Sequence, residues 1–178
     1  MGYRNFCVCF VVLLGLQAEA QFTRMDSIGN WYVIDHNLVW QKHYPLEDKE
    51  ELDVQLKSND FTADLDILKF GTSTVTRPYT LAGDNLPEYA RHEYKAFLIV
   101  DFFSDTYRVT IKQITFPDFV EKIYWNGMRQ TDSRGSLEHY ILRSDGLIKR
   151  YDVNLRVLES FDSAFSGVFD PMAGIWSE

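Results

Sequence analysis

The sequence predicts an α+β fold in which an antiparallel sheet of about five or six strands carries two helices packed on one face. Two β-rich runs, 93–103 and 106–116, flank Ser104-Asp105 and are typical of a tight hairpin. Two further segments, 47–58 and 151–169, have helical patterns. The order of these elements along the chain favours helices that lie on one face of an antiparallel sheet.

The first part of the predicted domain is a lead followed by a hairpin. Residues 21–29 are interpreted as a loose lead. The runs 31–34 and 38–44 are aromatic and β-branched, and they surround Asp35-His36-Asn37. This pattern predicts two strands joined by a turn.

A helix, a strand-like region and a loop are predicted next. Residues 47–58 place acidic side chains in a first turn, where the helix dipole stabilises them. Leu52 and Leu56 give this helix a thin apolar stripe. Residues 60–79 are strand-like, and 81–91 contain the glycine and proline that are typical of a loop.

The hairpin over 93–116 is the clearest element of the prediction. Residues 96–100 are apolar on both faces, which predicts a central strand covered on one side by a helix. The second run alternates apolar and polar side chains, so one of its faces is expected to be buried and the other solvated. The alternating residues are Tyr107, Val109 and Ile111, and Arg108, Thr110 and Lys112.

The remaining chain predicts turns and a long helix. Asn126-Gly127 and Asp145-Gly146 are turn dipeptides within the less regular region 117–150. An amphipathic helix is predicted over 151–169, and Pro171 follows its end. Its apolar face contains Tyr151, Leu155, Leu158, Phe161, Phe165 and Phe169.

Residues 1–20 are interpreted as a secretory signal peptide, which leaves a single domain over 21–178. The apolar run 6–16 is too short to span a bilayer, for which about 20 residues are needed. Ala18 and Ala20 fit the small-residue rule for signal peptidase. We therefore expect an exported protein, periplasmic or secreted, with no transmembrane segment after the signal peptide is removed.

Composition excludes several chemistries. Both cysteines, Cys7 and Cys9, lie in the predicted signal peptide, so the mature chain has no thiol for a disulfide, a nucleophile or a metal site. The net charge is −8, from 18 Lys and Arg against 26 Asp and Glu. That balance weighs against nucleic-acid binding, because phosphates are neutralised by basic surfaces.

The chain contains no nucleophile elbow, zinc-protease helix, phosphate-binding loop or dinucleotide fingerprint, so we assign no catalytic, cofactor-binding or metal residue. Asp60, Asp64 and Asp66 lack the glycine turn and the later glutamate of a calcium loop. Four basic residues are candidates for one sheet face, either as a modest anion site or as the solvated side of the sheet: Arg77, Lys95, Arg108 and Lys112.

Three segments occur in a recognisable order: 37–44 (NLVWQKHY) with the acidic helix after it, 105–114 (DTYRVTIKQI), and 165–169 (FSGVF) with Trp176. In this order they resemble a family of uncharacterised exported proteins of the Bacteroidota, which carry a domain of unknown function with a TATA-binding-protein-like (TBP-like) fold. The resemblance implies a curved antiparallel sheet backed by two helices. It brings no catalytic residues, and it does not imply DNA binding, which needs a basic concave face.

These observations favour a non-enzymatic module of the bacterial cell envelope that binds an envelope protein or a small ligand. Aromatic side chains anchor many interfaces. Six of them are candidates for an interaction surface, unless they belong to the core: Trp31, Tyr32, Trp40, Tyr44, Tyr124 and Trp125.

Two other functions are carried as alternatives. Gly29-Asn30-Trp31-Tyr32 looks like the G-x-W-Y start of a lipocalin, which would make the protein a carrier of a small apolar ligand. The helix predicted over 47–58 interrupts the eight strands that such a barrel needs. A hydrolase using Asp64, Asp66 or Glu93 would require two of these carboxylates to lie close together.

Overall fold

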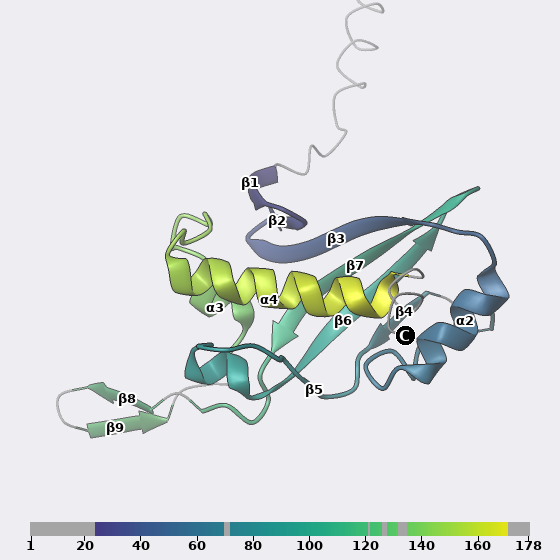
Figure 1. Cartoon of the computed structure of the whole chain (residues 1–178). Helices are drawn as coiled ribbons and strands as arrows, with labels where there is room; N and C mark the ends of the chain where they lie inside the picture. Colours follow the sequence, from purple (N-terminus) through teal and green to yellow (C-terminus); the bar gives the residue numbers. More distant parts are fainter. Residues whose placement is uncertain (1–23, 70–71, 121, 126–127, 132–134, 171–178) are drawn as a thin grey trace, which may run out of the picture.

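The computed structural model describes residues 24–69, 72–120, 122–125, 128–131 and 135–170, without the side chains of 24–25, 122–125 and 128–131 (Figure 1). The predicted signal peptide, residues 1–20, lies outside this part of the chain and stays a prediction. Among the described residues, no helix combines the length and the apolar character that are needed to cross a membrane.

An open antiparallel sheet forms the body of the molecule. Its strands follow the order β1-β2-β3-β7-β6-β4, and β5 also pairs with β6. The strands are β1 (Arg24–Ile28), β2 (Trp31–Ile34), β3 (Asn37–Pro45), β4 (Ser73–Val75), β5 (Tyr79–Thr80), β6 (Glu93–Phe102) and β7 (Thr106–Thr115). A separate two-stranded sheet is made of β8 (Lys122–Trp125) and β9 (Met128–Thr131).

The helices are α2 (Lys49–Ser58), α3 (Leu137–Ile141) and α4 (Asp152–Phe169), with a 3₁₀ turn, η1 (Glu88–Arg91). Figure 1 shows α4 lying across β3, β7 and β6, with the β8–β9 hairpin away from the sheet. The α+β class and the antiparallel sheet are therefore confirmed. In the described part of the chain the main sheet has seven strands where five or six were expected, and there are three helices where two were expected.

Both predicted hairpins form. Strands β2 and β3 are joined by Asp35 and His36, which have φ values of 49° and 62°. Positive φ at both positions of a two-residue turn matches the right-handed twist of the flanking strands. Strands β6 and β7 pair in register across their length except at one irregularity, which lies between Lys95 and Phe97.

One face of the sheet forms the core with α4. The strand register places Trp31 opposite Trp40 and Trp40 opposite Ile111, so all three point to the same side. Phe161 and Phe165 of α4 are buried against the two tryptophans at ring distances of 5.3 to 6.2 Å. Because the face is apolar and continuous, burial of α4 on it supplies the main hydrophobic driving force.

The two core tryptophans also have partners for their polar atoms. The indole Nε1–H of Trp31 donates to the carbonyl of Leu158 at 3.0 Å. The indole Nε1–H of Trp40 donates to Oδ1 of Asp162 at 2.7 Å, and the same oxygen accepts from Asn30 at 2.7 Å. Buried indoles usually need such a partner, so these bonds fix where α4 lies along the strands.

Helix α2 begins after Asp48, an aspartate at the N-cap position, where this residue type is favoured. Oδ1 of Asp48 accepts hydrogen bonds from the N–H groups of Glu50 and Glu51, at 2.7 and 3.3 Å, which satisfies two donors of the first turn. Leu52 and Leu56 are buried, as the thin stripe predicted. The helix covers Lys49–Ser58, whereas 47–58 was predicted, so it starts two residues later than expected and ends at the predicted residue.

Two expectations about local structure were wrong. The lead over 21–29 contains strand β1, which pairs with β2 through a turn at Gly29, where φ is +56°. Residues 60–69 contain turns, and between 72 and 80 the chain forms only the short strands β4 and β5. Buried Phe61 and Leu65 explain the error, because a turn that contributes apolar side chains to the core has the same composition as a strand.

The C-terminal helix differs from its prediction in one detail. Phe161, Phe165 and Phe169 are buried as expected, but Tyr151 is 68% exposed. It precedes the first helical residue as the N-cap, so its side chain does not follow the helical stripe. Asn154 occupies a buried position instead, and its amide donates to the carbonyl of Lys149 at 3.2 Å.

A second aromatic group holds α3 at the end of β7. The rings of Tyr89 and Tyr140 stack at 3.9 Å, and Tyr89 also meets Phe116 edge-on. Thr115 and Ser136 form an isolated β-bridge directly before α3. These contacts bring the first turn of α3 beside the last residues of β7.

Candidate functional site

The face of the sheet opposite the α4 core carries an open pocket of about 570 Å³. Six of the residues that line it come from five elements: His36 from the β2–β3 turn, Val75 from β4, Lys95 and Phe97 from β6, Gln113 from β7, and Glu138 from α3. Residues that share this face with Phe97 pair across the strands, as Lys112 and Asp101–Arg108 do. We call this face the open face and the hollow the open-face pocket.

A β-bulge builds the floor of the pocket. Lys95 pairs with Thr115 and Phe97 pairs with Lys112, so Ala96 faces two residues of β7, Gln113 and Ile114. An extra residue of this kind bends a strand and re-aims its side chains. Here Lys112 and Gln113 are consecutive residues that both avoid the core, whereas Ile114 returns to it.

Gln113 has a left-handed backbone, with φ of 54°. Its β-carbon makes this conformation unfavourable by roughly 1–2 kcal/mol relative to ordinary strand geometry. Gln113 is also exposed, so its side chain gains no core packing that would offset the strain. The bulge offsets this cost, because it lets Ile111 and Ile114, three positions apart in β7, both face the core.

The β2–β3 turn forms a second wall with an unusual backbone. Asp35 and His36 both have positive φ, although turns of this type favour Asn and Gly. The Asn37 side-chain amide donates to the carbonyl of Asp35 at 2.9 Å, which supports the turn. The strained turn and the strained bulge thus lie on the same pocket.

Glu138 is the carboxylate of the pocket. Burial raises its pKa above the ordinary range for glutamate. Hydrogen bonds from its own N–H, from the Ser136 hydroxyl and from the Leu38 N–H oppose that effect without cancelling it. A titratable group with a shifted pKa in a hollow is a feature of binding and catalytic sites.

The cations of the open face differ in how they are neutralised. Arg108 donates two hydrogen bonds to Oδ2 of Asp101, the shorter at 2.7 Å. The Lys112 ammonium lies 5.5 Å from the centre of the Phe97 ring. Among the described residues, Lys95 makes no ion pair or side-chain hydrogen bond.

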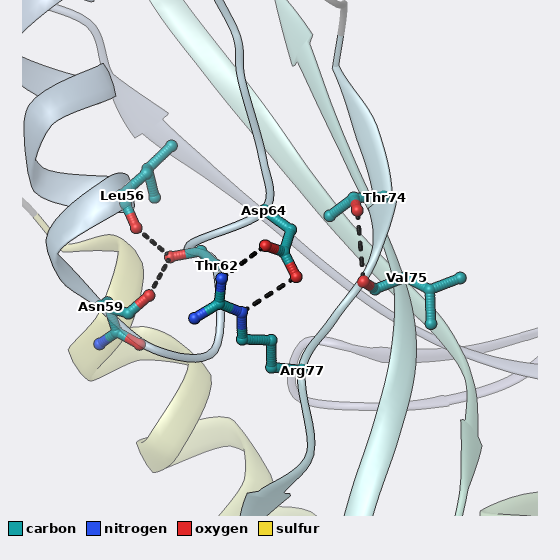
Figure 2. Close-up of polar contacts among 7 residues, drawn as sticks. All are labelled: Leu56, Asn59, Thr62, Asp64, Thr74, Val75 and Arg77. Atoms are coloured by element: carbon teal, nitrogen blue, oxygen red, sulfur yellow. Dashed lines mark hydrogen bonds and ion pairs between the residues drawn. The ribbon is translucent and has the colours of Figure 1, made fainter.

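The basic residues considered from sequence are only partly brought together. Lys95, Arg108 and Lys112 share the open face through the β6–β7 register. Arg77 instead donates to both oxygens of Asp64, at 2.7 and 3.0 Å, so its charge is already paired (Figure 2). Because Arg77 and Arg108 are paired with aspartates, the candidate anion site is limited to the part of the open face that contains Lys95.

Three residues of the predicted interaction surface are not accessible. Trp31 is 1% exposed, Trp40 is fully buried and Tyr44 is 4% exposed, so these rings belong to the core. Tyr32 is half-buried on the open face. The side chains of Tyr124 and Trp125 lie outside the described part of the chain.

The carboxylates of the hydrolase alternative have structural partners. Asp64 is paired with Arg77, as described above (Figure 2). Asp66 accepts from the N–H groups of Leu68 and Lys69 and lies 3.4 Å from the Lys57 ammonium. Glu93 lies at the start of β6, where its side chain is exposed. In the same part of the chain no three His, Cys, Asp or Glu side chains are grouped to hold a metal ion.

The polar loop drawn in Figure 2 therefore serves the fold. The Thr62 hydroxyl donates to the carbonyl of Leu56 at 2.6 Å, where it terminates α2. The Asp64–Arg77 pair then joins this loop to the chain after β4. Both partners of that ion pair are about half exposed, so its contribution to stability is small.

The sequence of β7 contains one signal for the pocket, a break in its alternation of apolar and polar residues. In β7 the apolar positions Tyr107, Val109 and Ile111 are followed by Ile114, so the period of two breaks at Lys112-Gln113. A break of this kind in a regular strand indicates a bulge. The contributions of His36 and Glu138 had no comparable signal, since they reach the pocket only through tertiary structure.

Comparison with known proteins yields no match for this chain among family models, curated proteins or solved structures.

Proposed function

We propose that this chain is an exported, non-enzymatic binding module of the bacterial cell envelope, and that it binds a small ligand in the open-face pocket. The observation that carries the proposal is the open-face pocket itself, a hollow of about 570 Å³ lined by charged, polar and apolar side chains. The bulge that contains Gln113 lets Ile111 and Ile114 both face the core, and it also leaves the Gln113 side chain at the pocket, where it can contact a ligand.

The dimensions of the pocket support a small ligand over a protein partner. Its volume of about 570 Å³ lies within the 300–1,000 Å³ that is usual for small-molecule sites. Phe97 and Val75 provide apolar surface, and polar groups from four other residues provide orientation. This mixture of one apolar wall with a few polar groups is the usual composition of a ligand site.

We also propose that the chain is exported and that its fold is TBP-like. A TBP-like arrangement has two helices on one sheet face, and two contacts of α2 support this. The Gln55 side-chain amide donates to the carbonyl of Val168 in α4 at 3.4 Å, and the Lys49 ammonium lies 4.3 Å from the Phe102 ring. In such a fold the opposite sheet face, with the pocket, is left free for function.

Neither alternative gains a supporting observation. The described sheet is open, with β1 and β4 at its two ends, whereas a lipocalin-like carrier needs a closed barrel. Asp64 and Asp66 are held by neighbouring cations, so they have structural roles that a hydrolase mechanism does not require.

Native mass spectrometry of the chain recovered gently from its own envelope fraction tests the proposal. We expect an added mass of a few hundred daltons on the wild-type protein. The variant Phe97→Ala, which opens one wall of the pocket, should lose this added mass. The matched variant Phe103→Ala changes an exposed ring that does not line the pocket, and it should retain the added mass.

Three outcomes would count against small-ligand binding at this site. They are a bare chain, an added mass that persists in Phe97→Ala, and co-purification of a second polypeptide in place of a small molecule. The last outcome would favour an envelope-protein partner. A melting experiment on both variants shows whether loss of the ligand is separate from loss of the fold.

A further inference from the structure

The charges around the open-face pocket are unusual for an acidic chain. The protein carries a net charge of −8, yet the described lining of the pocket has one lysine, one histidine and one carboxylate. Arg108, on the same face, is neutralised by Asp101. Lys95 lines the pocket and has no such acidic partner among the described residues.

The carboxylate of the pocket does not neutralise Lys95. The ion pairs of the described residues include none between Glu138 and Lys95, and Lys95 is not among the groups that shift the pKa of Glu138. Glu93 is two residues before Lys95 on the same strand, but it does not line the pocket. A lysine ammonium in this setting is a strong and uncompensated hydrogen-bond donor.

The other groups of the lining complete a site for an anion with an organic body. The Gln113 amide and the Thr115 hydroxyl supply neutral donors close to Lys95, since Thr115 is its register partner across the bulge. Phe97 and Val75 supply an apolar wall, and these two residues are also paired in register. Charge-assisted hydrogen bonds are about twice as strong as neutral ones, so Lys95 is the group that would select the ligand.

From this geometry we infer that the ligand of the open-face pocket is a small organic anion, whose carboxylate or phosphate binds Lys95 and Gln113 and whose body packs on Phe97. This inference rests on the proposed function, because it names the ligand class of the same pocket. The register supports it: Lys95 lies opposite Thr115, and Gln113, two residues before Thr115 on β7, lines the same pocket.

Calorimetric titration with matched pairs of small molecules tests the ligand class. Phenylacetate and phenylacetamide differ in charge and have nearly the same shape, and glucuronate and glucose form the same comparison on a sugar body. Inorganic phosphate serves as an anion without an organic body. We expect one of the two carboxylates to bind more tightly than its neutral counterpart, and the difference to shrink as salt is added.

Two charge variants connect the result to the site. Lys95→Gln should weaken binding of the carboxylate by about tenfold, which is the usual effect of losing one hydrogen bond to a charged group. Lys69→Gln removes the same charge from an exposed residue outside the pocket lining, and it should leave affinity unchanged. Glu138→Gln removes the only carboxylate in the described lining and should strengthen binding.

The outcomes separate the ligand class from the site itself. Equal binding of the charged and neutral members of a pair, or equal loss in Lys95→Gln and Lys69→Gln, would overturn the anion inference and leave the pocket as a ligand site. Binding of phosphate alone would identify the anion as free phosphate and overturn the organic body. If no probe binds while the native protein still carries an added mass, the ligand belongs to another chemical class. If that added mass is also missing, the proposed function fails together with the inference.

Discussion

Replacing Phe165 with alanine is the most direct test of how α4 holds the sheet. The ring is 1% exposed and lies within 5.3 to 6.3 Å, centre to centre, of five other aromatic rings. Those rings come from β2, β3, the turn after α2, β6 and α4 itself: Trp31, Trp40, Phe61, Tyr94 and Phe161.

The magnitude of the effect follows from this packing. A buried phenylalanine changed to alanine costs about 3–5 kcal/mol, through lost burial and the cavity that remains. Five ring neighbours from separate elements leave little room for the site to collapse, so we expect about 4 kcal/mol. For a domain of this size that corresponds to a fall in melting temperature of roughly 8–16 °C.

Urea unfolding followed by far-ultraviolet circular dichroism measures the change. Phe103→Ala is the matched control, because Phe103 is 47% exposed and should cost less than about 1 kcal/mol. A Phe165→Ala effect no larger than that of Phe103→Ala would refute the packing of α4 on the sheet. The slope of the transition should be the same for both variants, since a changed slope would indicate altered unfolding behaviour.

Three further predictions concern single contacts. Asp162→Ala should cost about 1–3 kcal/mol in urea unfolding, because it leaves the buried Nε1–H of Trp40 without its acceptor, whereas Asp162→Asn should cost less. Gln113→Gly should raise the free energy of unfolding by about 0.5–1 kcal/mol, because glycine adopts positive φ without a β-carbon clash, and Gln113→Val should lower it. Burial would raise the pKa of Asp26, but hydrogen bonds from two backbone N–H groups and from Arg150 outweigh it, and the pKa is lowered. That carboxylate therefore adds stability above its unfolded pKa of about 3.9 and loses the contribution as the pH falls through its lower folded value, so Asp26→Asn should be less stable than wild type at pH 7 and approach it in acid.

The elements with strong local patterns could be predicted from sequence. The β2–β3 and β6–β7 hairpins and the helix over 152–169 follow from alternation, turn residues and helical spacing, each of which acts within a few residues. The region 60–79 could not be predicted this way. Phe61 is buried there because it fits between Tyr94 and Phe165, and those neighbours are distant in sequence.

The role of the aromatic residues was the hardest part to predict. Trp31 and Trp40 have the size and polarity of interface anchors, and nothing local distinguishes an anchor from a core ring. Their burial depends on α4, whose Phe165 is more than a hundred positions away in the chain. Sequence alone therefore could not say which of these aromatic side chains another element covers.

The pocket lies on the open face, and the residues of that face are a better guide to function than those of the core face. The core face tolerates few changes, because its rings and their polar atoms are all engaged with α4, so its residues are accounted for by stability. On the open face, Gln113 lines the pocket with a positive φ, and Lys95 has no acidic partner in the described chain. A strand without the bulge would turn either Ile111 or Ile114 out of the core, so the bulge is explained by packing whereas the charge of Lys95 is not. A lysine that lines a hollow and has no acidic partner adds nothing evident to stability, and a bound anion would give it one, so the argument for an anion rests on Lys95 and the lining around it.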